Sequence, residues 1–221
     1  MRPFLDQLAP YLPLLMRGAV TTCKLCAFAY MIGMPLGLMS GYVRHRETPL
    51  LSWALNATSI LFKTIPFLVI LFWLHYPLQQ LLSIVVSPLI TGTFALSALC
   101  ATLVSDSLKF ELNRFPKELI EMGSVLGVKR RQLFLKLQVP YLIKATLPQI
   151  LSIMITVLHA SLFCSFISVE EIFRVTQALN TEIYRPVEIY STMALALFLL
   201  SAALFVLASL LRKKWRHNEF S

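Results

Sequence analysis

One polar stretch interrupts an otherwise apolar chain, and it limits the possible folds more than any other feature. Between Lys109 and Lys144 there are eight Lys/Arg residues (109, 114, 117, 129, 130, 131, 136 and 144) against three Glu residues (111, 118 and 121). Long apolar runs flank it on both sides, and 57% of the 221 residues are hydrophobic. Basic loops between apolar spans stay on the cytoplasmic side of a bilayer. The sequence therefore predicts a multi-spanning membrane protein with this stretch inside.

The apolar runs predict an all-α membrane protein with five transmembrane helices. Each run is long enough to cross the hydrocarbon core. The expected spans are 18–43, 51–76, 88–108, 147–169 and 187–211. We expect an interfacial segment at 1–17, a transmembrane domain at 18–211 with a cytoplasmic loop at 109–146, and a cytoplasmic tail at 212–221. The N-terminus is then outside and the C-terminus inside.

The net charge of +9 does not indicate nucleic acid, because the basic residues flank the apolar runs. Fourteen of the 20 Lys/Arg residues are Arg44, Arg46, the eight of the loop, and four between Arg212 and Arg216. No P-loop motif, metal-ligand cluster or nucleophile–base set is present, so we expect no catalysis, metal or cofactor in this chain. The pair Cys23 and Cys26 is interpreted as helix-packing residues rather than a redox or metal motif.

Small residues mark two places of expected close packing. Gly33, Gly37 and Gly41 give the first span a small-residue face, with Pro35 as a predicted kink; a moving gate helix is the functional alternative. The third span is rich in Ser, Thr, Ala and Gly, so it should be buried among helices. At its inner end, Asp106 and Lys109 are one turn apart and are expected to pair.

The polar loop also carries glycines. On a helix from Pro116, the small residues Gly123, Ser124 and Gly127 would form a ridge beside an apolar stripe of Leu119, Met122 and Leu126. Each helical glycine costs roughly 1 kcal/mol relative to alanine. We therefore expect another transmembrane helix or a docked protein to approach the backbone closely here.

This loop resembles the EAA loop of bacterial ABC-importer permeases. The matching residues are Glu121-Met122-Gly123, then Gly127, and later Val139-Pro140, with Met and Gly in place of the family's Ala pair. The resemblance implies a coupling helix between the third and fourth spans that sits in a groove of an ATPase subunit. The implied coupling residues are Glu121, Met122, Gly123, Leu126 and Gly127. A linker that only packs on the helix bundle is the alternative.

Two further segments resemble permeases for polar amino acids. Residues 62–68, Phe-Lys-Thr-Ile-Pro-Phe-Leu, are similar to the family's Phe-Arg-Gly-Thr-Pro-Leu-Leu, and residues 185–190 are similar to its Arg-Pro-Phe-Glu-Val-Tyr. Where the family has Lys-Asp in the fourth span, this chain has His159 and Ala160. Polar side chains at membrane depth are candidate site residues, so we expect His159, Ser161 and Lys63 to face a substrate pathway. Bonding within the bundle, or snorkelling for Lys63, is the alternative.

The resemblance implies the permease subunit of an ATP-driven importer in the bacterial inner membrane, with amino acids as the expected solute. It implies as partners an ABC ATPase, a second permease subunit (in a homo- or heterodimer), an extracytoplasmic solute-binding protein and membrane lipids. The outer residues 170–185 could touch that binding protein. The alternatives are an importer for methionine or an opine, a passive channel subunit, and a membrane scaffold.

Overall fold

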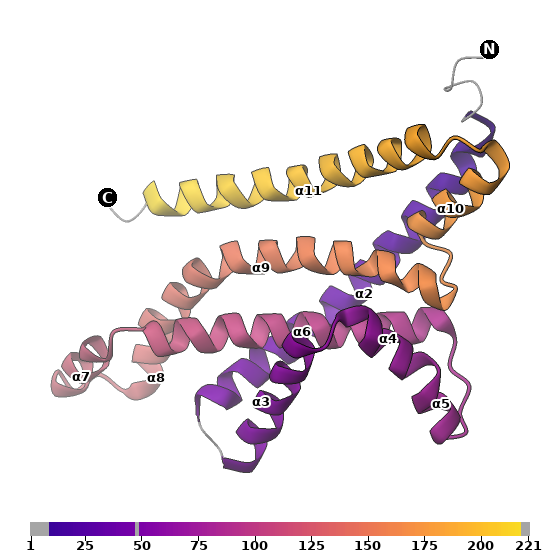
Figure 1. Ribbon diagram of the computed structural model, residues 1–221. Coiled ribbons are helices and arrows are strands. Elements are labelled where there is room, and N and C mark those ends of the chain that lie inside the picture. The colour runs from indigo at the N-terminus through magenta and orange to yellow at the C-terminus, as the bar shows by residue number, and fades with distance from the viewer. Residues whose placement is uncertain (1–8, 47–48, 218–221) are drawn as a thin grey trace.

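The protein is a bundle of helices, seen here in a computed structural model that describes residues 9–46 and 49–217 (Figure 1). Residues 1–8 of the expected interfacial segment and 218–221 of the expected tail lie outside this range. The helices are η1 (Ala9–Tyr11), α2 (Leu12–His45), α3 (Pro49–Thr64), α4 (Phe67–His75), α5 (Pro77–Leu81), α6 (Pro88–Arg114), α7 (Lys117–Val125), α8 (Arg130–Leu133), the π-helix η2 (Phe134–Gln138), α9 (Val139–Ser161), the 3-10 helix η3 (Leu162–Ile167), α10 (Ile172–Ile183) and α11 (Pro186–His217).

Four helical stretches in the described residues are long and apolar enough to cross a membrane, and a bent pair gives a fifth. The four are Leu12–His45, Pro88–Arg114, Arg131–Ile167 and Pro186–Ala203. This confirms the predicted all-α membrane fold. The first span is longer than expected, because α2 already begins at Leu12 rather than Gly18.

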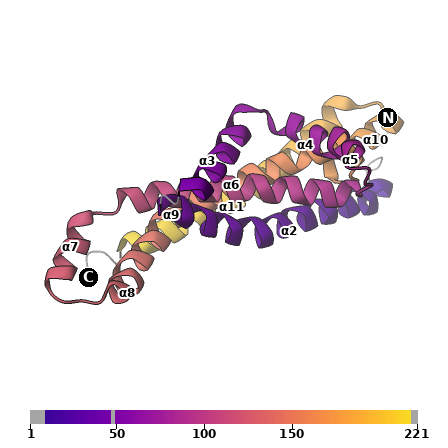
Figure 2. The same ribbon diagram turned by 90° about the horizontal axis from the view of Figure 1, so that it is seen from below.

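The segments that connect the long helices lie at two opposite ends of the bundle. Both views place α7 and α8 at one end, which we call the loop end, and α5 and α10 at the other (Figures 1 and 2). Helix α2 starts near α10, and α11 finishes at the loop end (Figure 1). The polar stretch is thus gathered on one side of the apolar bundle.

Helices α2 and α6 are in close contact along a row of glycines. A Cβ atom on Gly37 would lie 2.6 Å from Cβ of Val104 and 2.8 Å from the carbonyl oxygen of Ala101. The same substitution at Gly33 would bring a Cβ to 2.6 Å from Cβ of Cys100, and at Gly41 to 2.8 Å from the carbonyl oxygen of Ser105. No side chain fits at these positions. The small-residue face predicted for the first span is therefore a packing face against α6.

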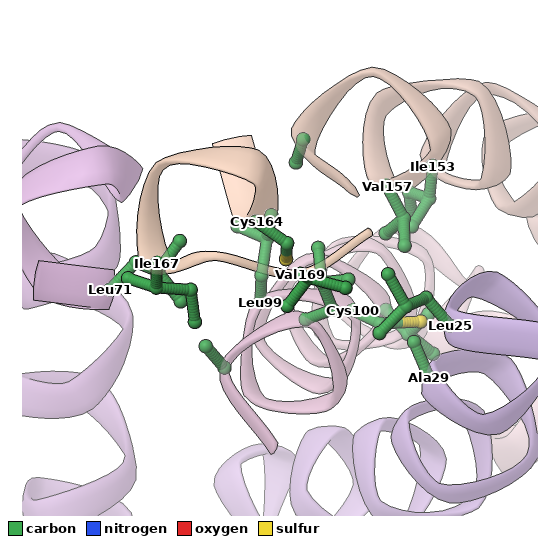
Figure 3. Close-up of a cluster of buried hydrophobic side chains, with 14 residues drawn as sticks. Leu25, Ala29, Leu71, Leu99, Cys100, Ile153, Val157, Cys164, Ile167 and Val169 are labelled. Carbon is green, nitrogen blue, oxygen red and sulfur yellow. The ribbon is translucent and has the colours of Figure 1, made fainter. Parts of the chain in front are cut away.

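Helix α6 forms the centre of the bundle. Of its most apolar 18 residues, 56% are buried, compared with 6% for α11. The main core gathers residues of α2, α4, α6, α9 and η3 around it, including Leu25, Leu71, Cys100, Val157 and Cys164 (Figure 3). The burial predicted for the third span from its small residues is confirmed. Of the four free cysteines, Cys26, Cys100 and Cys164 are buried, while Cys23 is exposed.

The second span is broken, which corrects the expectation of one helix over 51–76. Helix α3 ends at Thr64 and α4 starts at Phe67, and the two directions differ by 110° across the break. Pro66 has no N–H to donate to the preceding turn and disfavours helical geometry at Ile65. Its ψ of 134° is extended. The apolar run is long enough for a span, but its proline turns the chain.

The segment before the last span, expected as an outer loop over 170–185, contains a helix, α10. Helix α10 packs against α2, and a Cβ on Gly18 would lie 3.0 Å from Cα of Ile172. Glu171 caps α10 by accepting a hydrogen bond from the Arg174 N–H at 2.9 Å. Its carboxylate is fully buried, and Oε2 has no hydrogen-bond partner among the described residues. Burial raises the pKa of Glu171 to about 7.

The glycine row generates a first prediction. Gly37→Val adds three carbons where there is no room for one, so we expect it to destabilise the fold by roughly 1–3 kcal/mol. The measurement is the thermal unfolding midpoint of the full chain in detergent. Ala27→Val, on an exposed position of the same helix, is the control and should leave the midpoint almost unchanged. Equal midpoints for the two variants would contradict the packing assignment.

A second prediction concerns Glu171 and pH. The folded state holds the proton up to about pH 7, whereas the ordinary pKa of a Glu side chain is 4.5. The stabilisation is therefore complete below about pH 4.5 and lost as the pH rises through 7, with a maximum of roughly 3 kcal/mol. Glu171→Gln should abolish this slope in unfolding midpoints measured from pH 5 to 8. Glu170→Gln, at the exposed neighbour, should keep it; a slope unchanged in Glu171→Gln would rule out this origin.

Candidate functional site

Helix α7 presents apolar side chains that the described part of the chain leaves exposed. Leu119, Met122 and Val125 are exposed on the helix, and Leu126 directly after it is 77% exposed. Charged residues such as Glu118 and Glu121 flank them and are exposed as well. A soluble surface seldom gathers several large apolar side chains without a partner. The arrangement is typical of a docking face.

Gly123 holds α7 against the segment that follows it. A Cβ on Gly123 would lie 2.9 Å from Cδ1 of Leu133 and closer still to its Cδ2. The predicted close approach at Gly123 therefore exists within the chain, between α7 and α8. Within the described residues, the side chain that Gly123 admits is therefore that of Leu133 on α8.

Gly127 has a different role from the one that the helical ridge predicted. Helix α7 ends at Val125, and Gly127 adopts a left-handed conformation with φ of +71°. The Val128 N–H closes the turn by donating to the carbonyl oxygen of Gly123 at 3.0 Å. This bond is the six-residue contact of a Schellman motif, in which glycine avoids the strain of a Cβ. No atom of the described residues lies within 4 Å of the Cβ position, so within this part of the chain Gly127 serves the turn rather than a close contact.

A second group of candidate residues surrounds Asp106 on α6. Arg44, at the end of α2, donates to Oδ1 of Asp106 at 2.6 Å and to Oγ of Ser105 at 3.0 Å. Lys63, at the end of α3, lies 2.6 Å from Oδ2, and Ser59 donates to the same carboxylate at 2.8 Å. Three helices thus meet at one carboxylate. Two cations and a hydroxyl satisfy it, as a charge beside the apolar core requires.

The predicted pair between Asp106 and Lys109 is wrong. Lys109 donates instead to Oδ1 of Asn56 at 3.3 Å, on α3. Arg44, which from the sequence was only one of the basic residues that flank the apolar runs, is almost fully buried. No local spacing could reveal this residue, because it lies 62 residues before Asp106 and reaches it only through the glycine row.

The three residues predicted for a substrate pathway have different surroundings in the structure. Lys63 stands just before the α3–α4 break with 57% of its side chain exposed. His159 is exposed on α9, and its Nε2 lies 3.1 Å from Oγ of Ser201 on α11. Ser161 is fully buried and donates to the carbonyl oxygen of Leu158 at 2.8 Å. Among the described residues, no group of three His, Cys, Asp or Glu side chains could hold a metal ion.

Known proteins of similar sequence are permeases. The arginine transport system permease protein ArtQ of Bacillus subtilis is 22% identical over 95% of this chain and 96% of its own. The histidine/lysine/arginine/ornithine transport system permease protein HisQ of Salmonella typhimurium is 20% identical over 78% of this chain and 80% of its own. The glutamate/aspartate import permease protein GltK of Escherichia coli is 23% identical over 95% of this chain and 96% of its own.

Solved structures share the fold. A chain from the crystal structure of an amino acid ABC transporter with histidines superposes with a TM-score of 0.88 at 22% identity, over 97% of this chain and 99% of that one. A chain from the inward-facing methionine ABC transporter MetNI gives a TM-score of 0.76 at 17% identity, over 93% of this chain and 97% of that one. The arrangement of helices is therefore that of an ABC transporter membrane chain.

The family model described as "binding-protein-dependent transport system inner membrane component" matches residues 33–217. The match takes in α6, the whole polar loop and the three glycines Gly33, Gly37 and Gly41. Since it covers most of the chain, this protein belongs to the family of inner-membrane components of binding-protein-dependent transport systems.

Proposed function

We propose that this membrane transport subunit imports amino acids and is driven by a separate ATPase subunit that docks on α7. The solute class is supported by relatives whose names specify arginine, histidine, lysine, ornithine, glutamate or aspartate. The observation that carries the docking site is the uncovered apolar face of Leu119, Met122, Val125 and Leu126 at the loop end. Buried apolar anchors supply most of the affinity in protein interfaces.

The coupling residues of this proposal are Glu121, Met122, Gly123, Leu126 and Gly127. Met122 and Leu126 supply apolar contact, and Glu121 is exposed at the edge of the same face. Gly123 and Gly127 determine the shape of the loop. Gly123 leaves room for the side chain of Leu133, and Gly127 ends α7 with a positive φ. A push on α7 then reaches α9 through α8 and η2, and rigid elements transmit it to the spans.

Lys63 and His159 are the proposed pathway residues, with Ser161 behind them. The Lys63–Asp106 pair presents both charges beside a helix break, and a free amino acid also carries one charge of each sign. Transporters bind solutes at broken helices, where the N-terminus of the second half favours a carboxylate. The N-terminus of α4, at Phe67, comes four residues after Lys63. For Ser161 to meet solute, its buried contact with the core would have to open.

The assembly follows from the same proposal. The loop end faces the cytoplasm and the ATPase, as its basic residues favour. The end with α5 and α10 faces outward, toward a solute-binding protein. A second permease subunit pairs with this chain as a homo- or heterodimer. The methionine transporter's similar fold keeps methionine among the solutes to be tested.

The test is reconstitution of the full chain with its ATPase and binding protein in proteoliposomes. We expect ATP-dependent uptake of at least one labelled amino acid from a panel of arginine, histidine, glutamate, cystine and methionine. An ATPase variant that cannot hydrolyse ATP should abolish this uptake. Uptake without ATP would indicate a passive channel, and an ATPase that no solute stimulates would indicate a scaffold.

Copurification of the ATPase with variants of this chain tests the docking face on α7. Leu126→Asp should reduce copurification of the ATPase at least tenfold, because a carboxylate would be desolvated in an apolar contact. Leu81→Asp is the matched control, since Leu81 is 82% exposed but lies on α5 at the opposite end. Normal copurification with Leu126→Asp would reject α7 as the docking site while leaving the uptake result standing.

A separate prediction concerns Gly127. Its positive φ disfavours β-branched residues but admits asparagine, so Gly127→Asn should retain most uptake and Gly127→Val should lose most of it. The measurement is ATP-driven uptake at equal amounts of inserted protein. If both variants lose uptake, a partner must approach the glycine closely. If both retain uptake, the left-handed turn is not needed for coupling.

A further inference from the structure

A cavity separates the polar loop from the ends of the spans. It has a volume of about 510 Å³ and lies between the last turn of α2, the end of α6 and the α7–α8–η2 segment. Three basic side chains line it, namely His45, Arg46 and Arg131. The first two come from α2 and the third from α8. Two separate elements thus turn positive charge toward one hollow.

The basic groups on α2 are held in place by neighbours that leave donors free for a ligand. Arg46 donates to Oη of Tyr42 through Nε at 3.0 Å and also through Nη2, and its guanidinium lies 5.1 Å from the centre of the Tyr42 ring. His45 places Nδ1 2.8 Å from Oδ1 of Asn113, so its Nε2 remains on the other side of the ring. A guanidinium has five N–H donors, and those not used on Tyr42 can serve an anion.

No carboxylate lines this cavity in the described part of the chain. Glu111, the nearest acidic residue on α6 to the lining residue Leu112, is buried and accepts a hydrogen bond from Gln149 at 2.8 Å. Glu118 and Glu121 on α7 are exposed and are not part of the lining. Among residues 9–46 and 49–217, no carboxylate therefore faces the positive charge in this hollow, which favours an anion as its ligand.

We propose that the cavity binds a phosphate group, carried by the headgroup of an anionic phospholipid. Arginine recognises phosphate by paired hydrogen bonds, and Gln138 adds an uncharged polar group to the lining. The position favours a lipid over a soluble anion, because the hollow lies where two spans end and Leu112, Ile120 and Leu133 supply apolar walls. Basic pockets between helices at the inner membrane surface bind such headgroups.

A phosphate in this position would join α2 to α8. It would offset the repulsion between Arg46 and Arg131 and thereby hold the loop against the bundle. The α7 docking face belongs to the same loop, so anionic lipid would stiffen the connection between that face and the spans. This inference concerns lipid binding and stands whether or not α7 receives an ATPase.

The test uses the full chain, purified in detergent and stripped of lipid. Phosphatidylglycerol should raise its unfolding midpoint and should remain bound in native mass spectrometry, while phosphatidylcholine should do neither. The double variant Arg46→Gln/Arg131→Gln should bind phosphatidylglycerol at least tenfold more weakly, given what charge-assisted hydrogen bonds contribute. Arg114→Gln is the matched control, because it removes an exposed charge at the same end, outside the cavity.

Each outcome bears on the proposal. Loss of binding in the double variant but not in Arg114→Gln would support it. Equal loss in both would overturn it in favour of general surface charge, and equal affinity for the two lipids would also overturn it. The last measurement is the unfolding midpoint with glycerol 3-phosphate. If this compound stabilises the protein as much as phosphatidylglycerol does, the cavity binds phosphate but the proposal that a lipid supplies it is rejected.

Discussion

The close approach of α2 to α6 is the contact on which the rest of the structure depends. Three glycines, at positions 33, 37 and 41, let the two backbones come so near that a single methyl group would collide with the facing helix. Between helices in a bilayer there is little hydrophobic driving force, so dense packing supplies the stabilisation. One helical turn beyond this row, the same approach carries Arg44 onto α6.

The position of Arg44 against α6 explains why the charge of Asp106 is tolerated beside the apolar core. Asp106 lies on the most deeply buried helix, where a lone carboxylate would be costly. It receives Arg44 from α2 and Lys63 from α3, and so it connects three helices at one point. Since Lys63 ends α3 at the proline break, the position of α4 also depends on this contact. The glycine row, the ionic contact and the bent span therefore form one mechanical unit.

The sequence predicted the features that follow from amino-acid composition and from the spacing of residues along a helix. Apolar length predicted the spans, four-residue glycine spacing predicted the α2 packing face, and small residues predicted a buried α6. It was insufficient where the structure depends on distant residues or on backbone angles. A local spacing rule paired Asp106 with Lys109, because nothing nearby indicates that α2 brings Arg44 to the same place.

In the candidate site, too, the sequence predicted some features and not others. The apolar residues of α7 were found, because a helical stripe is visible in sequence, and they remain exposed in the fold. Gly127 was placed on a helix that in fact stops at Val125, since helix geometry was assumed where the chain turns to positive φ. Pro66 lacks the N–H that a continuous helix needs, but how far the chain turns there depends on the packing of α4 against the core.

The sparse burial of α11 has a consequence for how the protein adapts to its surroundings. Only 6% of its most apolar stretch is covered, and its neighbours within the chain are α9 and α10. A long helix fixed along one side changes its tilt at little energetic cost, and tilt is how a hydrophobic segment matches bilayers of different thickness. The central helices cannot adjust in this way, because their glycines and ionic contacts fix their separation. A change of membrane thickness can therefore be met by the tilt of α11, while α2 and α6 keep their separation.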